Sequence, residues 1–248
     1  MKQYKHILFD LDDTILDFQD TEEKALAKVI AQFKLPDTKE TVDCYKRINR
    51  SLWVNLEQGT ISREQLFSTR FSLFLKEFDI TEDGEKVEKL YRTNLGEGIK
   101  MIDNAKDVLS ALLSEGYHLH AATNGAAVTQ RKRLAGADLL SFFDGIFISE
   151  ELGYEKPDER FFQHIFHDLK TINKKDYLMV GDSLTSDIQG AVNAGIDSVW
   201  FNLRKAPVNA SGARSTYTIS ALPELLDIAG VTNTIKEETH AGSSLVSQ

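Results

Sequence analysis

Two carboxylates stand two residues apart at the point where a short apolar run ends. Residues 6–9 are largely apolar, and Asp10 and Asp12 follow within the sequence Asp-Leu-Asp-Asp-Thr. One carboxylate of such a pair can attack phosphorus as a nucleophile, while the other protonates the leaving oxygen and then activates water. The pair therefore indicates two-step hydrolytic chemistry, with an acidic loop that caps a strand as the structural alternative.

A second acidic segment follows another apolar run. Asp182 lies in Gly181-Asp182-Ser183, and Asp187 lies five residues later. An acid at this position can meet Asp10 across a sheet edge, and such oxygen ligands suit Mg²⁺. A divalent cation would offset the repulsion between a carboxylate and a phosphate. Asp187 has two interpretations of equal weight. It stabilises the start of a helix, or it orients the metal ligands without binding the metal itself.

Three further residues have types and positions suited to binding a phosphoryl group. Lys156 precedes Pro157 in a loop before a predicted helix, so its ammonium group can offset the acidic cluster. Thr123 and Asn124 end an apolar run, where a hydroxyl and backbone N–H groups can hold phosphate oxygens. The alternatives are a solvated surface lysine and an ordinary Thr-Asn-Gly turn.

The elements that must position these residues alternate between strands and helices. Apolar runs that predict buried strands cover residues 6–9, 118–122, 145–148, 177–180, 198–201 and 217–219. Helical patterns cover residues 105–114, 158–169, 186–194 and 223–229. This alternation predicts an α/β fold with a Rossmann-like parallel sheet and helices on both faces, in which active sites lie at the carboxyl ends of the strands.

One segment breaks the alternation. Residues 15–95 contain no convincing strand, and helical patterns cover residues 22–33, 39–56, 62–78 and 83–93. We therefore expect a helical-bundle cap inserted after the first strand, and a core formed by residues 1–14 and 96–232. Residues 233–248 are polar and predict a tail.

The order of the motifs resembles the four-motif pattern of the haloacid dehalogenase-like hydrolases. Asp-x-Asp-x-Thr, Thr-Asn-Gly, Lys-Pro and Gly-Asp-x-x-x-x-Asp occur in sequence, and the resemblance extends to about residue 230. It implies Asp10 as nucleophile and Asp12 as general acid and base. It further implies that Thr123 and Lys156 bind phosphate, and that Asp182 binds Mg²⁺ beside Asp10 and the Asp12 carbonyl.

Within that superfamily the chain is similar to the helical-capped pyrimidine 5′-nucleotidase branch. The segments 123–125, 148–157 and 178–183 carry this resemblance, together with Trp53 and Thr69-Arg70-Phe71. It implies a nucleoside monophosphate substrate, with Trp53 and Arg70 as candidate contacts, since an aromatic face can stack on a base. The alternatives are a small sugar or organic-acid phosphatase (phosphoglycolate-like), a β-phosphoglucomutase-like phosphomutase, a haloacid dehalogenase and a non-catalytic binding protein.

Composition narrows the function classes further. The chain has 248 residues and a net charge of −9, which disfavours nucleic acid polymers and anionic membranes as partners. Cys44 is its one cysteine, so a reducing cytoplasmic location is expected. No apolar run has the length of a membrane helix. The oligomeric state is not predicted.

Two groups of side chains are expected to have structural roles only. The basic run Arg131-Lys132-Arg133 predicts a solvated helix face. His118 and His120 flank a predicted strand, where we expect them to pack or to face solvent.

Overall fold

Six parallel strands form one sheet, in the order β3-β2-β1-β4-β5-β6. The computed structural model describes residues 4–206, 213–232 and 235. The strands are β1 (His6–Phe9), β2 (His118–Thr123), β3 (Gly145–Ile148), β4 (Tyr177–Gly181), β5 (Asp197–Phe201) and β6 (Tyr217–Ile219). The predicted α/β fold with a parallel sheet is confirmed.

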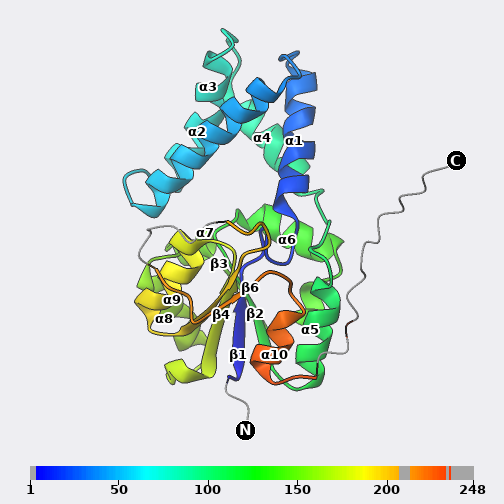
Figure 1. Cartoon of the computed structure of the whole chain (residues 1–248). Helices are drawn as coiled ribbons and strands as arrows, with labels where there is room; N and C mark the ends of the chain where they lie inside the picture. Colours follow the sequence, from blue (N-terminus) through cyan, green and yellow to red (C-terminus); the bar gives the residue numbers. More distant parts are fainter. Residues whose placement is uncertain (1–3, 207–212, 233–234, 236–248) are drawn as a thin grey trace, which may run out of the picture.

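Helices cover both faces of the sheet, with α8 and α9 on one side and α5 and α10 on the other (Figure 1). Ile7 and Phe9 of β1 pack in the core that includes α5 and α10, whereas Leu8 packs in the core that includes α8 and α9. This alternation follows from the two-residue period of a strand. The helices of this part are α5 (Ala105–Ser114), α6 (Ala127–Gly136), α7 (Ser149–Leu152), α8 (Glu159–Asp168), α9 (Gln189–Ala194) and α10 (Glu224–Ala229).

Four helices between β1 and α5 form a separate bundle, which we call the cap (Figure 1). They are α1 (Phe18–Gln32), α2 (Lys39–Glu57), α3 (Arg63–Lys76) and α4 (Gly84–Leu95). Each starts after a residue whose side chain accepts a hydrogen bond from the first helical turn, which satisfies a backbone donor there. These residues are Asp17, Thr38, Ser62 and Asp83.

The cap has its own hydrophobic core, in which Tyr45, Phe71, Phe74 and Tyr91 are fully buried. The exact division of the chain at residues 14 and 95 stays a prediction. The predicted tail, residues 233–248, lies outside the described residues except for Ile235.

Short irregular segments complete the α/β part. Residues Leu140–Phe142 (η1) and Lys174–Asp176 (η2) form 3₁₀ turns, and Leu184–Ile188 (η3) forms a π-helical turn directly before α9. The helix expected over residues 186–194 is therefore regular only from Gln189 onward.

Among the described residues, no helix combines the length and the apolar character needed to span a membrane.

Candidate active site

The strand order places three chemically important strand ends side by side. β1 pairs with β2 on one side and with β4 on the other, so the chain order reverses at β1. Asp10 follows β1, Thr123 ends β2 and Asp182 follows β4. Ligands of open parallel sheets bind at such a reversal, because the connections on its two sides diverge there.

Lys156 holds the acidic residues together. Its ammonium nitrogen lies 2.8 Å from Asp10 Oδ1, 2.6 Å from Asp187 Oδ1 and 2.5 Å from the carbonyl oxygen of Ala122. The Lys156 side chain is 1% exposed, so three acceptors use its three protons away from bulk water. The surface interpretation of Lys156 is therefore wrong.

A third carboxylate, that of Asp182, lies beside the two that bind this ammonium group. One oxygen each from Asp10, Asp182 and Asp187 lies within 4.8 Å of the others. Burial raises the pKa of Asp10 to about 8, with Asp187 and Asp12 acting in the same direction and Lys156 opposing them. Burial and the charges of Asp187 and Asp10 also raise the pKa of Asp182 well above its ordinary value. The ionised forms of these carboxyl groups are therefore disfavoured in the buried site, and a cation bound beside them would stabilise those forms.

Asp187 reaches this cluster because residue 181 is glycine. A Cβ atom at Gly181 would lie 2.2 Å from Asp187 Oδ2. That oxygen accepts a hydrogen bond of 3.0 Å from the backbone N–H of Ser183, while the other oxygen binds Lys156. These contacts support a structural role for Asp187, in which it fixes Lys156 and the Ser183 backbone. A role in orienting metal ligands stays a prediction.

Thr123 and Asn124 differ in how their side chains are used. Thr123 Oγ1 is buried and accepts hydrogen bonds from the Gly125 N–H (3.0 Å) and from Gln130 Nε2 (2.9 Å). The Asn124 amide binds the backbone of Lys156 twice, donating to its carbonyl (2.8 Å) and accepting from its N–H (2.9 Å). The Asn124 side chain thus positions Lys156, and both residues line the cavity described below.

Asp12 is held by two residues that the sequence did not reveal as functional. Gln130 Nε2 donates to Asp12 Oδ2 over 2.8 Å, and Arg133 Nη1 donates to Asp12 Oδ1. Arg133 is buried, so the expectation of a solvated face is wrong for this member of the basic run. The signal was present: both residues lie on the helix that follows Thr-Asn-Gly, and their spacing of three places them on one face.

A cavity of about 650 Å³ lies between these strand ends and the cap. Its lining includes Asp10, Asp12 and Asp182 from the sheet edge, and Trp53, Phe67, Arg70 and Arg92 from the cap. Trp53 and Phe67 meet edge to face with their ring centres 6.4 Å apart. Trp53 therefore lines the cavity from the cap, and its contact with substrate stays a prediction.

Arg70 and Arg92 differ in what their guanidinium groups bind. Arg70 is buried and donates to both carboxylate oxygens of Glu88 (3.0 and 2.6 Å) and to Asn49 (2.9 Å). The Arg92 guanidinium lies 4.6 Å from the Phe67 ring centre and 4.0 Å from a Glu150 oxygen. Arg70 therefore stabilises the cap, and its contact with substrate stays a prediction that this geometry does not favour.

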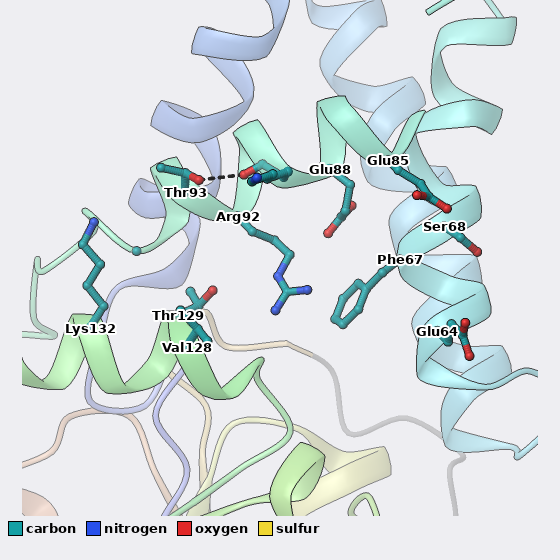
Figure 2. Close-up of a pocket in the computed structure, with 12 residues that line it drawn as sticks. Glu64, Phe67, Ser68, Glu85, Glu88, Arg92, Thr93, Val128, Thr129 and Lys132 are labelled. Carbon is teal, nitrogen blue, oxygen red and sulfur yellow. Dashed lines mark hydrogen bonds between the residues drawn. The ribbon is translucent and has the colours of Figure 1, made fainter. Parts of the chain in front are cut away.

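Arg92 also borders a neighbouring cavity of about 560 Å³ between the cap and α6. Figure 2 shows its side chain extending from α4 toward Thr129, with Phe67 facing it from α3. Phe67, Arg92 and Thr129 line both cavities. The space above the acidic cluster therefore adjoins a second space beside α6.

The arrangement combines a buried carboxylate on a strand end, a second one held by two donors, and an ammonium group among acids. It can support nucleophilic attack, proton transfer and the binding of an anion or a cation at one point.

Comparisons with known proteins agree with this geometry. The family model described as haloacid dehalogenase-like hydrolase matches residues 7–201. The chain is 40% identical to YfnB of Bacillus subtilis (strain 168), over 95% of this chain and 99% of YfnB. The crystal structure of YfnB bound to magnesium superposes with a TM-score of 0.86, covering 93% of this chain and all of that one.

Two further relatives carry activity names. The pyrimidine 5′-nucleotidase PynA of Streptococcus pneumoniae (strain ATCC BAA-255 / R6) is 39% identical over 90% of this chain and 94% of its own. The pyrimidine 5′-nucleotidase YjjG of Escherichia coli (strain K12) is 30% identical over 88% of this chain and 95% of its own. With the four motifs gathered at one sheet edge, these matches mean that the chain belongs to the haloacid dehalogenase-like hydrolases.

Proposed function

We propose that this protein is a magnesium-dependent phosphomonoester hydrolase that acts on nucleoside 5′-monophosphates, with a preference for pyrimidine nucleotides. The observation that carries the proposal is the contact of Lys156 with Asp10 and Asp187 at the strand ends, with the Asp182 carboxylate beside them. It gives a nucleophile, a fixed positive charge and oxygen ligands at one point.

The donor set fits a hard divalent cation. The nearest oxygens of Asp10, Asp182 and Asp187 lie within 4.8 Å of one another, and none of these donors is sulfur or imidazole. Mg²⁺ prefers oxygen ligands. Asp10, Asp182 and the Asp12 backbone carbonyl would hold it, and when bound it would neutralise charge between the carboxylates and the phosphate. The magnesium in the YfnB crystal structure supports this assignment.

The proposed reaction proceeds in two steps on the protein's own residues. Asp10 attacks phosphorus, the bond from phosphorus to the nucleoside oxygen breaks, and Asp12 gives its proton to that oxygen. Asp12 then takes a proton from water, which attacks the phosphoryl group and releases phosphate and free Asp10. Gln130 and Arg133 hold the Asp12 carboxylate, and Asn124 holds the backbone of Lys156.

The substrate class is supported by the relatives and by the cavity. PynA and YjjG are named as pyrimidine 5′-nucleotidases. A volume of about 650 Å³ is in the range of small-molecule sites, and Trp53 and Phe67 offer aromatic faces beside it. Stacking of a base on such a face contributes about 1–3 kcal/mol. A small metabolite substrate and a cytoplasmic location are part of the same proposal.

A substrate comparison tests it. We expect kcat/KM in the presence of Mg²⁺ to be higher for UMP, dUMP and dTMP than for purine nucleotides, phosphoglycolate or hexose phosphates. A preference of tenfold or more for the esters without a base would contradict the nucleotidase assignment, while any Mg²⁺-dependent phosphate release would still support the phosphatase.

A further inference from the structure

One cap arginine is bonded almost entirely to the core. Arg63 is the first residue of α3 and follows the turn that joins α2 to α3. Figure 1 shows this turn over the core, on the opposite side of the cap from α1. The chain enters the cap at α1, so Arg63 lies at the far end from that connection.

The Arg63 guanidinium donates to three residues of the core, one after β2 and two after β3. Nη1 binds the Asn124 carbonyl oxygen at 2.9 Å, Nη2 binds Ser149 Oγ at 2.6 Å, and Nε binds Glu155 Oε1 at 3.2 Å. The side chain is 12% exposed, and charge-assisted hydrogen bonds of this kind are stronger where water is excluded. One cap side chain thus ties together loops that follow β2 and β3.

Two of the three acceptors adjoin residues that are proposed to bind phosphate. Asn124 follows Thr123, and its amide binds the Lys156 backbone on both sides. Glu155 directly precedes Lys156, and Ser149 is fully buried at the end of β3. Movement of Arg63 would therefore release the loops that fix Thr123 and Lys156.

The same guanidinium also supports the cap side of the cavity. It lies 5.8 Å from the Trp53 ring centre and 5.9 Å from that of Phe67. A cation over an aromatic face is attracted by the ring, more strongly when it is desolvated. Arg63 therefore connects the aromatic wall with the phosphate-binding loops.

A second residue of this turn also faces the core. Glu57 ends α2 and lines the cavity together with Ser183 and Asp187, and burial raises the pKa of its carboxyl group. The α2–α3 turn therefore approaches the core on both of its sides, through Glu57 and through Arg63.

We propose that Arg63 is a positioning residue that docks the cap on the core and thereby sets the phosphate-binding loops and the aromatic wall at their working separation. The expected effect on KM and kcat rests on the proposed function, but the docking of the cap by Arg63 does not. Arg131 offers a matched control, because its guanidinium makes two hydrogen bonds of 2.9 and 2.7 Å to Glu151 on the exposed surface of the core.

The kinetic experiment compares Arg63→Met, Arg63→Lys and Arg131→Met with the unmodified protein, which we call the parent. Arg63→Met should raise KM for UMP at least tenfold and lower kcat, whereas glycerol phosphate, which has no base to place, should show a smaller rise in KM. Arg63→Lys should recover part of the loss, because an ammonium group can still donate to Asn124 and Glu155. Values for Arg63→Met within twofold of Arg131→Met would overturn the proposal.

A distance measurement provides the readout that does not need turnover. Spin labels on Val54→Cys in the cap and Ile172→Cys in the core, in a Cys44→Ser background, report the cap–core separation; both positions are exposed. The parent should give a narrow distribution, and Arg63→Met a broader and longer one. An unchanged distribution in a folded variant would overturn the proposal, even if the parent hydrolyses no nucleotide and the proposed function fails.

A double substitution separates docking from a local effect. Glu155→Gln removes the charge of one acceptor and should shift the distribution in the same direction, though less. Combined with Arg63→Met it should add nothing, because both changes remove the same contact. Additive shifts would overturn the assignment of Glu155 as an Arg63 partner.

Discussion

At the scale of single residues, the site rests on a buried lysine that is outnumbered by acids. Lys156 binds Asp10 and Asp187 directly, and burial by itself would lower its pKa, but these two carboxylates raise it above its ordinary value. The ammonium group therefore stays charged across the physiological range. A permanent positive charge at this point favours the arrival of a phosphate dianion, although the protein as a whole is acidic.

The first prediction concerns Asp10. Asp10→Asn keeps the shape of the side chain and removes the nucleophile, so turnover should fall by about 10⁴-fold or more. Phosphate release from UMP measures it, with circular dichroism as the check on folding. Release near the parental rate by a clean preparation would rule out the covalent mechanism.

The second prediction concerns Asp12 and the residues that hold it. Asp12→Asn should slow alkyl phosphates by about 10²- to 10⁴-fold but activated aryl phosphates much less, because only the poorer leaving group needs a proton. Arg133→Met should show the same pattern with a smaller loss, since it releases the Asp12 carboxylate. An equal loss on both classes of ester would assign Asp12 a different role.

At the scale of elements, the positions of the strands could be predicted from the sequence better than the side-chain contacts between one element and another. Every predicted strand is present, because a buried parallel strand needs a continuous apolar run. Arg133 and Arg63 escaped detection because their partners, Asp12 and Asn124, lie 121 and 61 residues away. Helical periodicity tells which face a residue occupies, but not whether that face meets an acidic loop. Periodicity likewise did not show that Arg70 pairs with Glu88 on the next helix, and the contact of Arg70 with substrate stays a prediction that this pairing does not favour.

A histidine cluster between β1 and β2 gives the third prediction. The His6 ring stacks against those of His118 and Tyr177, and His6 Nδ1 lies 3.1 Å from Nε2 of the buried His120. Burial lowers the pKa of His120 to about 4, with His6 and His118 adding to the effect and Asp144 opposing it. The pKa of His6 is lowered as well, chiefly by burial; Lys5 and His118 act in the same direction, and Asp176 and Asp144 oppose them.

Because the folded pKa lies below the unfolded value, the folded protein binds fewer protons between pH 6.5 and 4. Stability should therefore be lost as pH falls through this window, by about 3 kcal/mol for His120. Urea unfolding at several pH values measures it. His120→Leu should flatten the slope, and the exposed His167→Gln should not; equal slopes in all three proteins would contradict the cause assigned here.

At the scale of the whole molecule, the α/β part and the cap, each with its own hydrophobic packing, share one site. The α/β part brings the acids and Lys156 together, and the cap covers them with Trp53, Phe67 and Arg92. We therefore expect the chemistry and the selectivity to reside in different parts of the chain. A change in the cap should alter which ester is cleaved more than how it is cleaved.

The fourth prediction concerns the metal. Exhaustive treatment with EDTA should abolish phosphate release, and Mg²⁺ should restore it, because the acidic cluster needs a cation to accept a phosphate. Calorimetric titration with Mg²⁺ gives a readout apart from activity, and Asp182→Asn should weaken that binding. Full activity after chelation would contradict the magnesium site.

The last prediction places the base of the substrate against the cap. Trp53 lines the cavity and is fixed by Phe67 on one side and by the Arg63 guanidinium on another. If its face stacks on the base, Trp53→Ala should raise KM for UMP by about 5- to 150-fold, which corresponds to ~1–3 kcal/mol. KM for glycerol phosphate should change little, because the phosphate contacts come from the core.

Phe78→Ala is the matched control for Trp53→Ala. Phe78 packs edge to face on Phe74 in the cap core, so its loss should lower stability without changing either KM. Equal rises in KM for both esters in Trp53→Ala would instead assign Trp53 to holding the cap together, and base recognition would then have to come from Phe67 and Arg92.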